Sequence, residues 1–209
     1  MNIIICDDHK IVRDGLQQIL MQLEDVTSII DVANGDELLL HLGVKVFDIV
    51  LLDISLPGKS GLEILQIVKQ KWPSTNILIL SMYPHEQYAI RALKLGAAGY
   101  LTKDTASSEL LTAVKKISIG GKYISAALAE NLALNLGSEK YKQKHDILSV
   151  REFEILIKLA NGKSLQEIGA ELFISNKTVS TYRSRIMDKM ELTKNTDLAR
   201  YCIENKLIY

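Results

Sequence analysis

The chain has 209 residues, 47% of them apolar, and its 25 basic and 25 acidic side chains cancel to a formal net charge of zero, which predicts one or two domains with modest cores. No apolar run approaches the ~18 to 20 residues of a membrane span, and the first residues lack a signal peptide's basic start and cleavage site, so we expect a cytoplasmic protein without membrane contact. Cys6 and Cys202 fall in separate predicted domains without metal-binding spacing, which argues against a disulfide or a zinc site.

Strands and helices alternate along the first part of the chain. Apolar runs predict strands near residues 2–6, 27–32, 48–53, 76–81 and 98–102, and amphipathic stretches predict helices at 10–23, 35–42, 60–71, 86–95 and 106–119. This alternation is typical of an α/β fold with right-handed crossovers. We therefore expect a doubly wound, five-stranded parallel sheet of the flavodoxin-like order 2-1-3-4-5.

Polar side chains stand where these apolar strands end. Asp7 and Asp8 follow the first strand, Asp53 ends the third, Ser81 ends the fourth and Lys103 follows the fifth. The carboxyl ends of parallel strands meet at one edge of a sheet, so these side chains should converge. Crowded carboxylates repel one another, and hard oxygen ligands suit Mg²⁺. The sequence thus predicts a magnesium site in which Asp53 is a nucleophile toward a phosphoryl group.

Each of these residues also has an ordinary interpretation when it is taken alone. An acid pair after a strand is common in solvated turns and helix caps, a lysine there is usually just exposed, and Ser81 is an ordinary turn residue. Order and spacing favour the joint interpretation, because independent strand ends each deliver the residue type that phosphoryl chemistry needs.

Residues 1 to about 119 resemble the receiver domain of two-component response regulators. The residues that carry this resemblance are Asp7 and Asp8, Asp53 followed by Pro57 and Gly61, Ser81, and the segment 99–103 with its Tyr100 and Lys103. The resemblance implies that Asp53 accepts phosphate from the phosphohistidine of a sensor histidine kinase. It further implies that Asp8, Asp53 and the backbone carbonyl of Ser55 hold Mg²⁺, with Asp7 as an acid behind these ligands.

The same resemblance implies a conformational switch. Ser81 and Tyr100 match a pair in which the hydroxyl moves toward the phosphate and the aromatic ring follows it inward. Many receivers carry proline after the lysine, whereas this chain has Asp104, so the cis peptide that proline favours is not assumed here.

The chain changes character after the glycine pair at 120–121. The polar, basic stretch 137–145 reads as a linker, and the pattern from Leu148 onward is entirely helical. Serines open the predicted helices: Ser149 with Glu152 for a helix through Asn161, Ser164 with Glu167 for a short helix through Leu172, and Ser175 or Asn176 for a helix through Met190. A short helix, a tight turn and a helix with a polar outer face are the sequence form of a helix-turn-helix.

Positive charge is concentrated on the last of these helices. Lys177, Arg183, Arg185 and Lys189 stand there against only Asp188, where DNA phosphates would lie, although a solvated helix face would give the same charges.

Residues 148 to 209 resemble the four-helix DNA-binding domain of the LuxR/NarL/FixJ class, on the segments 148–156, 160–164, 167–169 and 174–182. The resemblance implies that the helix from Asn176 enters the major groove, and that the helix near 196–205 forms a dimer contact. Base-facing positions would be Ser180, Thr181 and Ser184, and phosphates or neighbouring base edges would be met by Lys177, Thr178, Tyr182, Arg183 and Arg185. Many relatives carry lysine where Ser180 stands, which points to a different base preference that leans on water or DNA shape.

We therefore expect a receiver domain over 1–120, a linker over 121–145 and a helix-turn-helix domain over 146–209. The predicted protein is a phosphorylation-dependent transcription regulator of the NarL/FixJ family that takes phosphate from a sensor kinase, forms a homodimer and binds double-stranded DNA. It is not expected to be an enzyme beyond its own phosphotransfer and autodephosphorylation.

Other function classes fit less well. An aspartate-nucleophile phosphatase needs a second acid two residues after Asp53, where Ser55 stands, and no Gly-rich segment ends in the Gly-Lys-Ser/Thr of a P-loop. A regulator of the same architecture that works without phosphate remains the main alternative.

Overall fold

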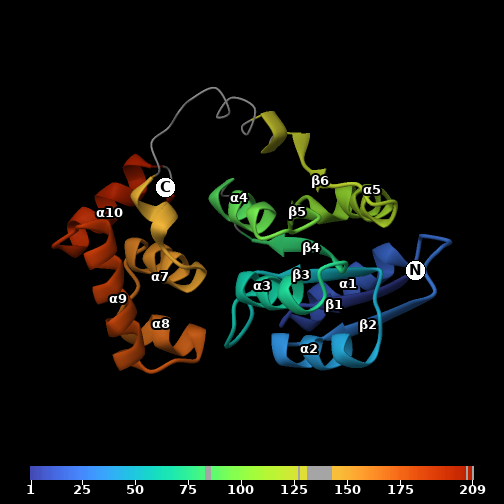
Figure 1. Ribbon diagram of the computed structural model, residues 1–209, viewed down its shortest axis with the longest axis horizontal. Coiled ribbons are helices and arrows are strands. Elements are labelled where there is room, and N and C mark those ends of the chain that lie inside the picture. Colours follow the sequence, from blue (N-terminus) through green and yellow to red (C-terminus); the bar gives the residue numbers. More distant parts are fainter. Residues whose placement is uncertain (83–85, 127, 131–142, 206, 209) are drawn as a thin grey trace. The chain divides into compact units, whose positions relative to one another are not determined.

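The computed structural model describes residues 1–82, 86–126, 128–130, 143–205 and 207–208 (Figure 1). The chain forms two compact units, Met1–Leu134 and Asn135–Tyr209. Among the residues described, no helix is both long and apolar enough to cross a bilayer.

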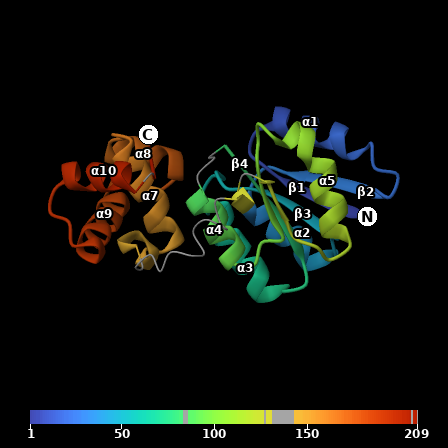
Figure 2. The same cartoon turned by 90° about the horizontal axis from the view of Figure 1, so that it is seen from above.

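The first unit is a parallel sheet with helices on both faces (Figures 1 and 2). Its strands are β1 (Asn2–Cys6), β2 (Ser28–Val32), β3 (Ile49–Asp53), β4 (Asn76–Ser81), β5 (Gly99–Thr102) and β6 (Tyr123–Ile124). Its helices are α1 (Lys10–Leu20), α2 (Gly35–Val44), α3 (Gly61–Lys71), α4 (Glu86–Lys94) and α5 (Ala106–Ser118). The strand order is β2-β1-β3-β4-β5-β6, which confirms the predicted doubly wound fold.

The sheet differs from the prediction by one additional strand at its edge. β6 pairs in parallel with β5, with Tyr123 opposite Gly99 and Ile124 opposite Tyr100. A two-residue strand is too short to give a periodic pattern, so β6 falls within the predicted linker 121–145. The Tyr123 hydroxyl donates to Glu109 Oε2 at 2.9 Å, which ties this segment to α5. Residues 127 and 131–142 of the predicted linker lie outside the described residues.

The central strands are buried on both faces, which explains their continuous apolar sequence. Ile3, Ile5 and Leu51 point to the face covered by α1 and α5 and join one apolar cluster with side chains of these two helices. The other face carries α2, α3 and α4 (Figure 2). Burial on both faces fixes the strand register, and the register fixes where the polar strand ends meet.

The second unit is helical, as predicted. Its elements are a short 3₁₀ helix η1 (Lys144–Ile147), α7 (Val150–Ala160), α8 (Leu165–Leu172), α9 (Asn176–Met190) and α10 (Asn195–Glu204). Ser149 and Ser164 form the predicted capping boxes with Glu152 and Glu167. Ser175 caps α9 by accepting from the Thr178 amide at 3.1 Å.

A tight turn joins α8 to α9. Phe173, which follows α8 as its C-cap, has a left-handed backbone conformation with φ 54°. The side chain of Arg151, on α7, contacts the same end of α8. Its guanidinium donates to the Leu172 carbonyl at 3.0 Å and pairs with Glu154 at 2.8 Å. A buried arginine therefore satisfies a carbonyl that the end of α8 leaves without a helical partner.

Candidate functional site

Strand register brings the predicted polar residues to one edge of the sheet. Cys6 lies opposite Leu52, so Asp7 and Asp53 leave neighbouring strands side by side. Asp53 lies opposite Leu80, one residue before Ser81, and Ser81 lies opposite Thr102, one residue before Lys103. The carboxyl edge thus carries acids, a hydroxyl and an ammonium from β1, β3, β4 and β5.

Lys103 joins two buried acids of this edge. Its Nζ lies 2.6 Å from Asp7 Oδ2 and 2.9 Å from Asp53 Oδ2, and both acids are almost fully buried. Burial raises the pKa of the Asp53 carboxyl, while the Lys103 ammonium opposes this rise and the Asp7 carboxylate adds to it. Burial alone would lower the pKa of Lys103, but the two carboxylates outweigh it and raise that pKa.

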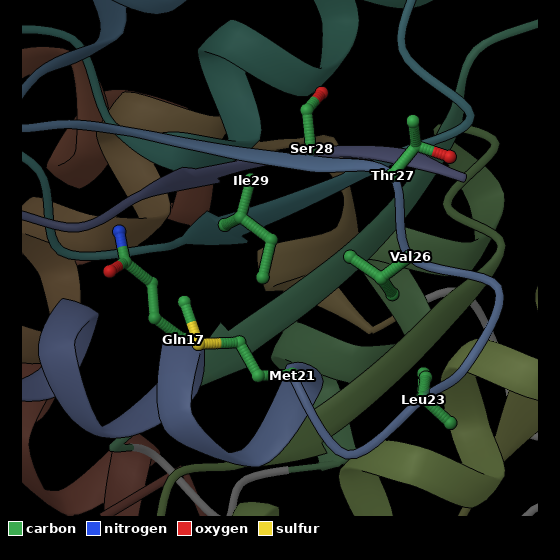
Figure 3. A pocket seen from close by; sticks show the side chains of 7 residues that line it. All are labelled: Gln17, Met21, Leu23, Val26, Thr27, Ser28 and Ile29. Carbon is green, nitrogen blue, oxygen red and sulfur yellow. The ribbon is translucent and has the colours of Figure 1, made fainter.

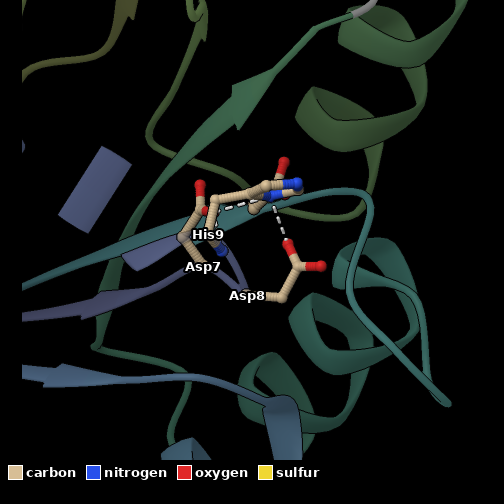
Figure 4. Close-up of side chains that lie close together, drawn as sticks. Asp7, Asp8 and His9 are labelled. Atoms are coloured by element: carbon tan, nitrogen blue, oxygen red, sulfur yellow. Dashed lines mark hydrogen bonds and ion pairs between the residues drawn. The ribbon is translucent and has the colours of Figure 1, made fainter. Parts of the chain in front are cut away.

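Asp8 and His9 complete a possible cation site at the same edge (Figure 4). Asp7, Asp8, His9 and Asp53 each offer one ligand atom, and these atoms all lie within 4.8 Å of one another. Asp53 is almost fully buried and shares the Lys103 ammonium with the buried Asp7. One ammonium does not balance several crowded carboxylates, so this oxygen-rich donor set fits the Mg²⁺ that receiver domains bind.

The remaining predicted residues lie around this pocket. Ser81 is fully buried at the end of β4, and its carbonyl accepts from the Lys103 amide at 2.8 Å. Tyr100 on β5 is also buried, with 4% of its surface exposed. Ser55 is partly buried in the loop from β3 to α3, and Asp104 is exposed beyond β5. No cis peptide occurs among the described residues.

Arg13 takes part in the site although the sequence reading did not select it. Its Nη1 donates to the Asp7 carbonyl at 2.7 Å, and its Nε donates to Asp31 Oδ2 at 2.7 Å. The guanidinium therefore links α1 and β2 to the turn that carries the acid pair. The only sequence signal is its spacing, because Arg13 shares the buried stripe of α1 with Leu16 and Leu20.

A second hollow on this unit lies between α1 and β2 (Figure 3). Its lining residues are Gln17, Met21, Leu23, Val26, Thr27, Ser28 and Ile29. None of these side chains is charged, so the acidic edge is the stronger candidate for chemistry.

We expect Asp53→Asn to raise the thermal stability of the metal-free protein. The folded pKa of Asp53 lies above its ordinary 3.8. Its stabilising contribution is therefore present below that value and is lost as the pH rises through the folded pKa, so the ionised group costs stability at neutral pH. Asparagine removes this cost. Mg²⁺ at ten times its Kd should stabilise wild type by about 1.4 kcal/mol and the variant by less. The difference in stability between the two proteins should therefore shrink when Mg²⁺ is added.

Thermal unfolding with EDTA and with Mg²⁺ measures both effects. Asp14→Asn is the control, since Asp14 is an exposed acid that pairs with Lys10 at 3.1 Å, outside the acidic pocket. A variant less stable than wild type in EDTA and equally responsive to Mg²⁺ would contradict this account.

The helix α9 presents a polar outer surface in the second unit. Val179 and Ile186 bury its inner side, whereas Lys177, Thr181 and Ser184 share one exposed stripe at helical spacing. Thr178 and Arg185 are exposed on the neighbouring stripe, where Tyr182 is partly buried between them, and Ser180 and Arg183 are partly buried beside them.

Fewer basic side chains of α9 are available to DNA than its sequence indicates. Lys189 pairs with the buried Glu152 at 2.7 Å, and Arg183 Nε donates to Asn195 Oδ1 at 2.9 Å. The Arg185 guanidinium lies over the Tyr182 ring, 6.0 Å from its centroid, and remains exposed. Lys177 and Arg185 therefore carry most of the available positive charge on this face.

Comparison with known proteins identifies both units. Residues 3–115 match the response regulator receiver domain, and residues 146–202 match the bacterial regulatory proteins of the luxR family. The chain is a two-component response regulator of the NarL/FixJ class. As a response regulator it combines a receiver with a LuxR-type helix-turn-helix, which is the architecture of a phosphorylation-dependent, DNA-binding transcription regulator.

Relatives of this response regulator share its full length. The chain is 36% identical over 211 residues to the uncharacterized transcriptional regulatory protein YhcZ of Bacillus subtilis, covering 99% of the chain and 97% of that protein. It is 34% identical over 215 residues to the oxygen regulatory protein NreC of Staphylococcus haemolyticus, covering 100% and 99%.

A solved structure shares the same architecture. RcsB of Salmonella enterica serovar Typhimurium, bound to promoter P1flhDC in the presence of phosphomimetic BeF₃⁻, aligns with a TM-score of 0.62 and 28% identity. The alignment covers 96% of this response regulator and 97% of RcsB.

Proposed function

We propose that this protein is switched on by phosphorylation of Asp53 and then binds DNA as a dimer through α9. The observation that carries this proposal is the buried cluster of Asp7, Asp53 and Lys103 on a chain that also exposes the polar face of α9. A buried acid held against a lysine is a nucleophile in a preorganised, charged pocket.

The phosphoryl group comes from a sensor histidine kinase. A carboxylate oxygen of Asp53 forms the new O–P bond while the N–P bond of the kinase phosphohistidine breaks and its imidazole leaves. Asp8, Asp53 and the Ser55 carbonyl would hold Mg²⁺, with Asp7 behind them, and when bound the ion would offset the charge on the phosphoryl oxygens. Lys103 stays beside Asp53 and pairs with one of those oxygens.

Ser81 and Tyr100 couple the phosphoryl group to assembly. The Ser81 hydroxyl, at the end of β4, donates to a phosphoryl oxygen, and Tyr100 packs in the space that its movement leaves. This rearrangement changes the surface around 86–119 and favours the homodimer, with α10 as a second dimer contact.

The second domain reads DNA with α9. Ser180, Thr181 and Ser184 face bases, and phosphates or nearby base edges are met by Lys177, Thr178, Tyr182, Arg183 and Arg185. The proposed bounds are 1–120 for the receiver, 121–145 for the linker and 146–209 for the DNA-binding domain. The whole protein works in the cytoplasm. Autodephosphorylation, in which water attacks the aspartyl phosphate, is the only other reaction proposed.

The test is incubation with acetyl phosphate and Mg²⁺, followed by intact mass, sizing and DNA binding. We expect one added phosphate, a shift from monomer to dimer and tighter binding to specific DNA. A protein that dimerises and binds DNA equally well without phosphate would instead be the phosphate-independent regulator of the same architecture.

Base-facing and phosphate-facing residues of α9 should separate in a salt series. Arg185→Ala should weaken binding to all sequences about equally and reduce the slope of log K against log salt by ~1, because each neutralised phosphate releases condensed counterions. Thr181→Ala should change the preferred half-site with little effect on the slope. Both variants are measured on a specific site and on random duplex.

Lys189→Ala is the matched control, since its charge is already paired with Glu152. An unchanged slope in Arg185→Ala, together with an altered base preference, would reverse the roles of Arg185 and Thr181.

A further inference from the structure

His9 lies beside the acidic pocket, and the roles proposed above leave it unused. It precedes α1 as its N-cap residue, but its side chain makes no hydrogen bond to the helix terminus. Its Nδ1 lies 2.7 Å from Asp8 Oδ1 and 3.4 Å from Asp7 Oδ1 (Figure 4). The imidazole thus faces the acids rather than the helix.

The spacing of these atoms suits a single metal ion. In an octahedral site with metal–ligand distances of about 2.1 Å, neighbouring ligands lie about 3.0 Å apart and opposite ligands about 4.2 Å apart. The distances of 2.7 and 3.4 Å from His9 Nδ1 correspond to neighbouring positions. Together with Asp53, all the ligand atoms fall within 4.8 Å of one another, so small side-chain movements would bring them to one ion.

Lys103 leaves the required oxygens available. It contacts the Oδ2 atoms of Asp7 and Asp53. The other oxygen of Asp7, Oδ1, accepts from the His9 amide at 2.9 Å and lies 3.4 Å from His9 Nδ1. Since a carboxylate oxygen has more than one lone pair, this oxygen can also meet a cation, and the ligand atom of Asp53 lies within 4.8 Å of those of the other three residues.

We propose that His9 Nδ1 is a metal ligand, so that the pocket takes a first-row transition ion through one nitrogen in addition to its carboxylates. This inference rests on the proposed function, because it concerns the same metal pocket. Imidazole suits nickel, zinc, copper and iron, whereas Mg²⁺ prefers oxygen and keeps its waters. The His9 side chain is 66% exposed, and with Nδ1 as the ligand the ring proton would lie on Nε2.

The consequence is a second class of cofactor for the receiver. Ni²⁺ stands high in the affinity order of divalent transition ions for most ligand sets, so tight binding of Ni²⁺ does not by itself identify His9 as a ligand. The informative measurement is the loss of Ni²⁺ affinity in His9→Ala relative to wild type.

The test is calorimetric titration of tag-free protein with Ni²⁺ and with Mg²⁺, in wild type, His9→Ala and His41→Ala. His41 lies on α2 outside the cluster and is the control. Loss of a directly bound nitrogen should cost His9→Ala at least about tenfold in Ni²⁺ affinity, no less than the lower end of the ~10–100-fold that loss of a ligand's partner costs. The loss in Mg²⁺ affinity should be clearly smaller, because Mg²⁺ prefers oxygen ligands. The visible absorption of bound Co²⁺ should also differ between wild type and His9→Ala, because a nitrogen ligand has been removed.

The outcomes separate the two proposals. Equal Ni²⁺ affinities in wild type and His9→Ala, or equal losses for both ions, would overturn the role of His9 and leave the phosphoacceptor site standing. Failure of wild type to bind Mg²⁺ would instead overturn the proposed metal site itself. A loss for Ni²⁺ in His41→Ala as large as in His9→Ala would also refute the assignment.

Discussion

Asp53→Asn is expected to take up no phosphate from acetyl phosphate and Mg²⁺, whereas wild type takes up one. The amide is a poor nucleophile, and Asp53, buried at the end of β3 beside Lys103, is the proposed acceptor. Phosphate-dependent dimerisation and DNA binding should disappear with it. Intact mass spectrometry at fixed times measures uptake, and sizing measures assembly.

Two further variants locate the cause of that loss. Lys103→Met removes the ammonium that contacts both buried acids and should slow uptake while leaving the acceptor in place. Asp36→Asn, an exposed acid paired with Lys59, should behave as wild type. Stoichiometric labelling of Asp53→Asn would mean that another residue is the acceptor.

Gly61→Ala is expected to be the most destabilising single-methyl change in the receiver. A Cβ at Gly61 would lie 1.9 Å from the Asp53 carbonyl oxygen and 2.9 Å from Ile54 Cα. Both neighbours are backbone atoms of the strand end, so they cannot turn aside as a side chain does. We expect a cost of about 3 kcal/mol, a fall in the receiver's melting midpoint of about 10 °C, and slower phosphate uptake, since a 1 Å misplacement can cost roughly 100-fold.

Gly15→Ala is the matched control. Gly15 lies inside α1 with nothing within 4 Å of its virtual Cβ, so alanine should stabilise the helix by about 0.5 to 1 kcal/mol. Differential scanning calorimetry and the uptake rate of both variants test the pair. Similar midpoints for Gly61→Ala and wild type would mean that the loop from β3 to α3 can open at little cost.

Local patterns predicted most of the fold. β1 and β3 are recognisable because strands buried on both faces need continuous apolar sequence, and α7 is recognisable because Ser149 and Glu152 encode their own capping box. β6 is missing from the prediction because two residues carry no period. Its existence depends on β5, which lies more than twenty residues earlier in the chain.

Long-range contacts account for what the sequence did not predict at the site. Arg13 reads as an ordinary helix residue until Asp31 is found beside it. Lys189 reads as available charge until Glu152, on another helix, is found to neutralise it. The polar strand ends were predictable because parallel topology alone brings them together, whereas these pairings depend on how the helices pack.

The buried position of Tyr100 has a consequence for signalling range. The ring is only 4% exposed, so the proposed movement of Ser81 and Tyr100 repacks the interior of the fold. To move an equilibrium between two such arrangements from 1:99 to 99:1, phosphate must favour the active one by about 5.5 kcal/mol. A weaker preference leaves part of the protein in the other arrangement, so the range of the output depends on how strongly the phosphoryl group discriminates between the two packings.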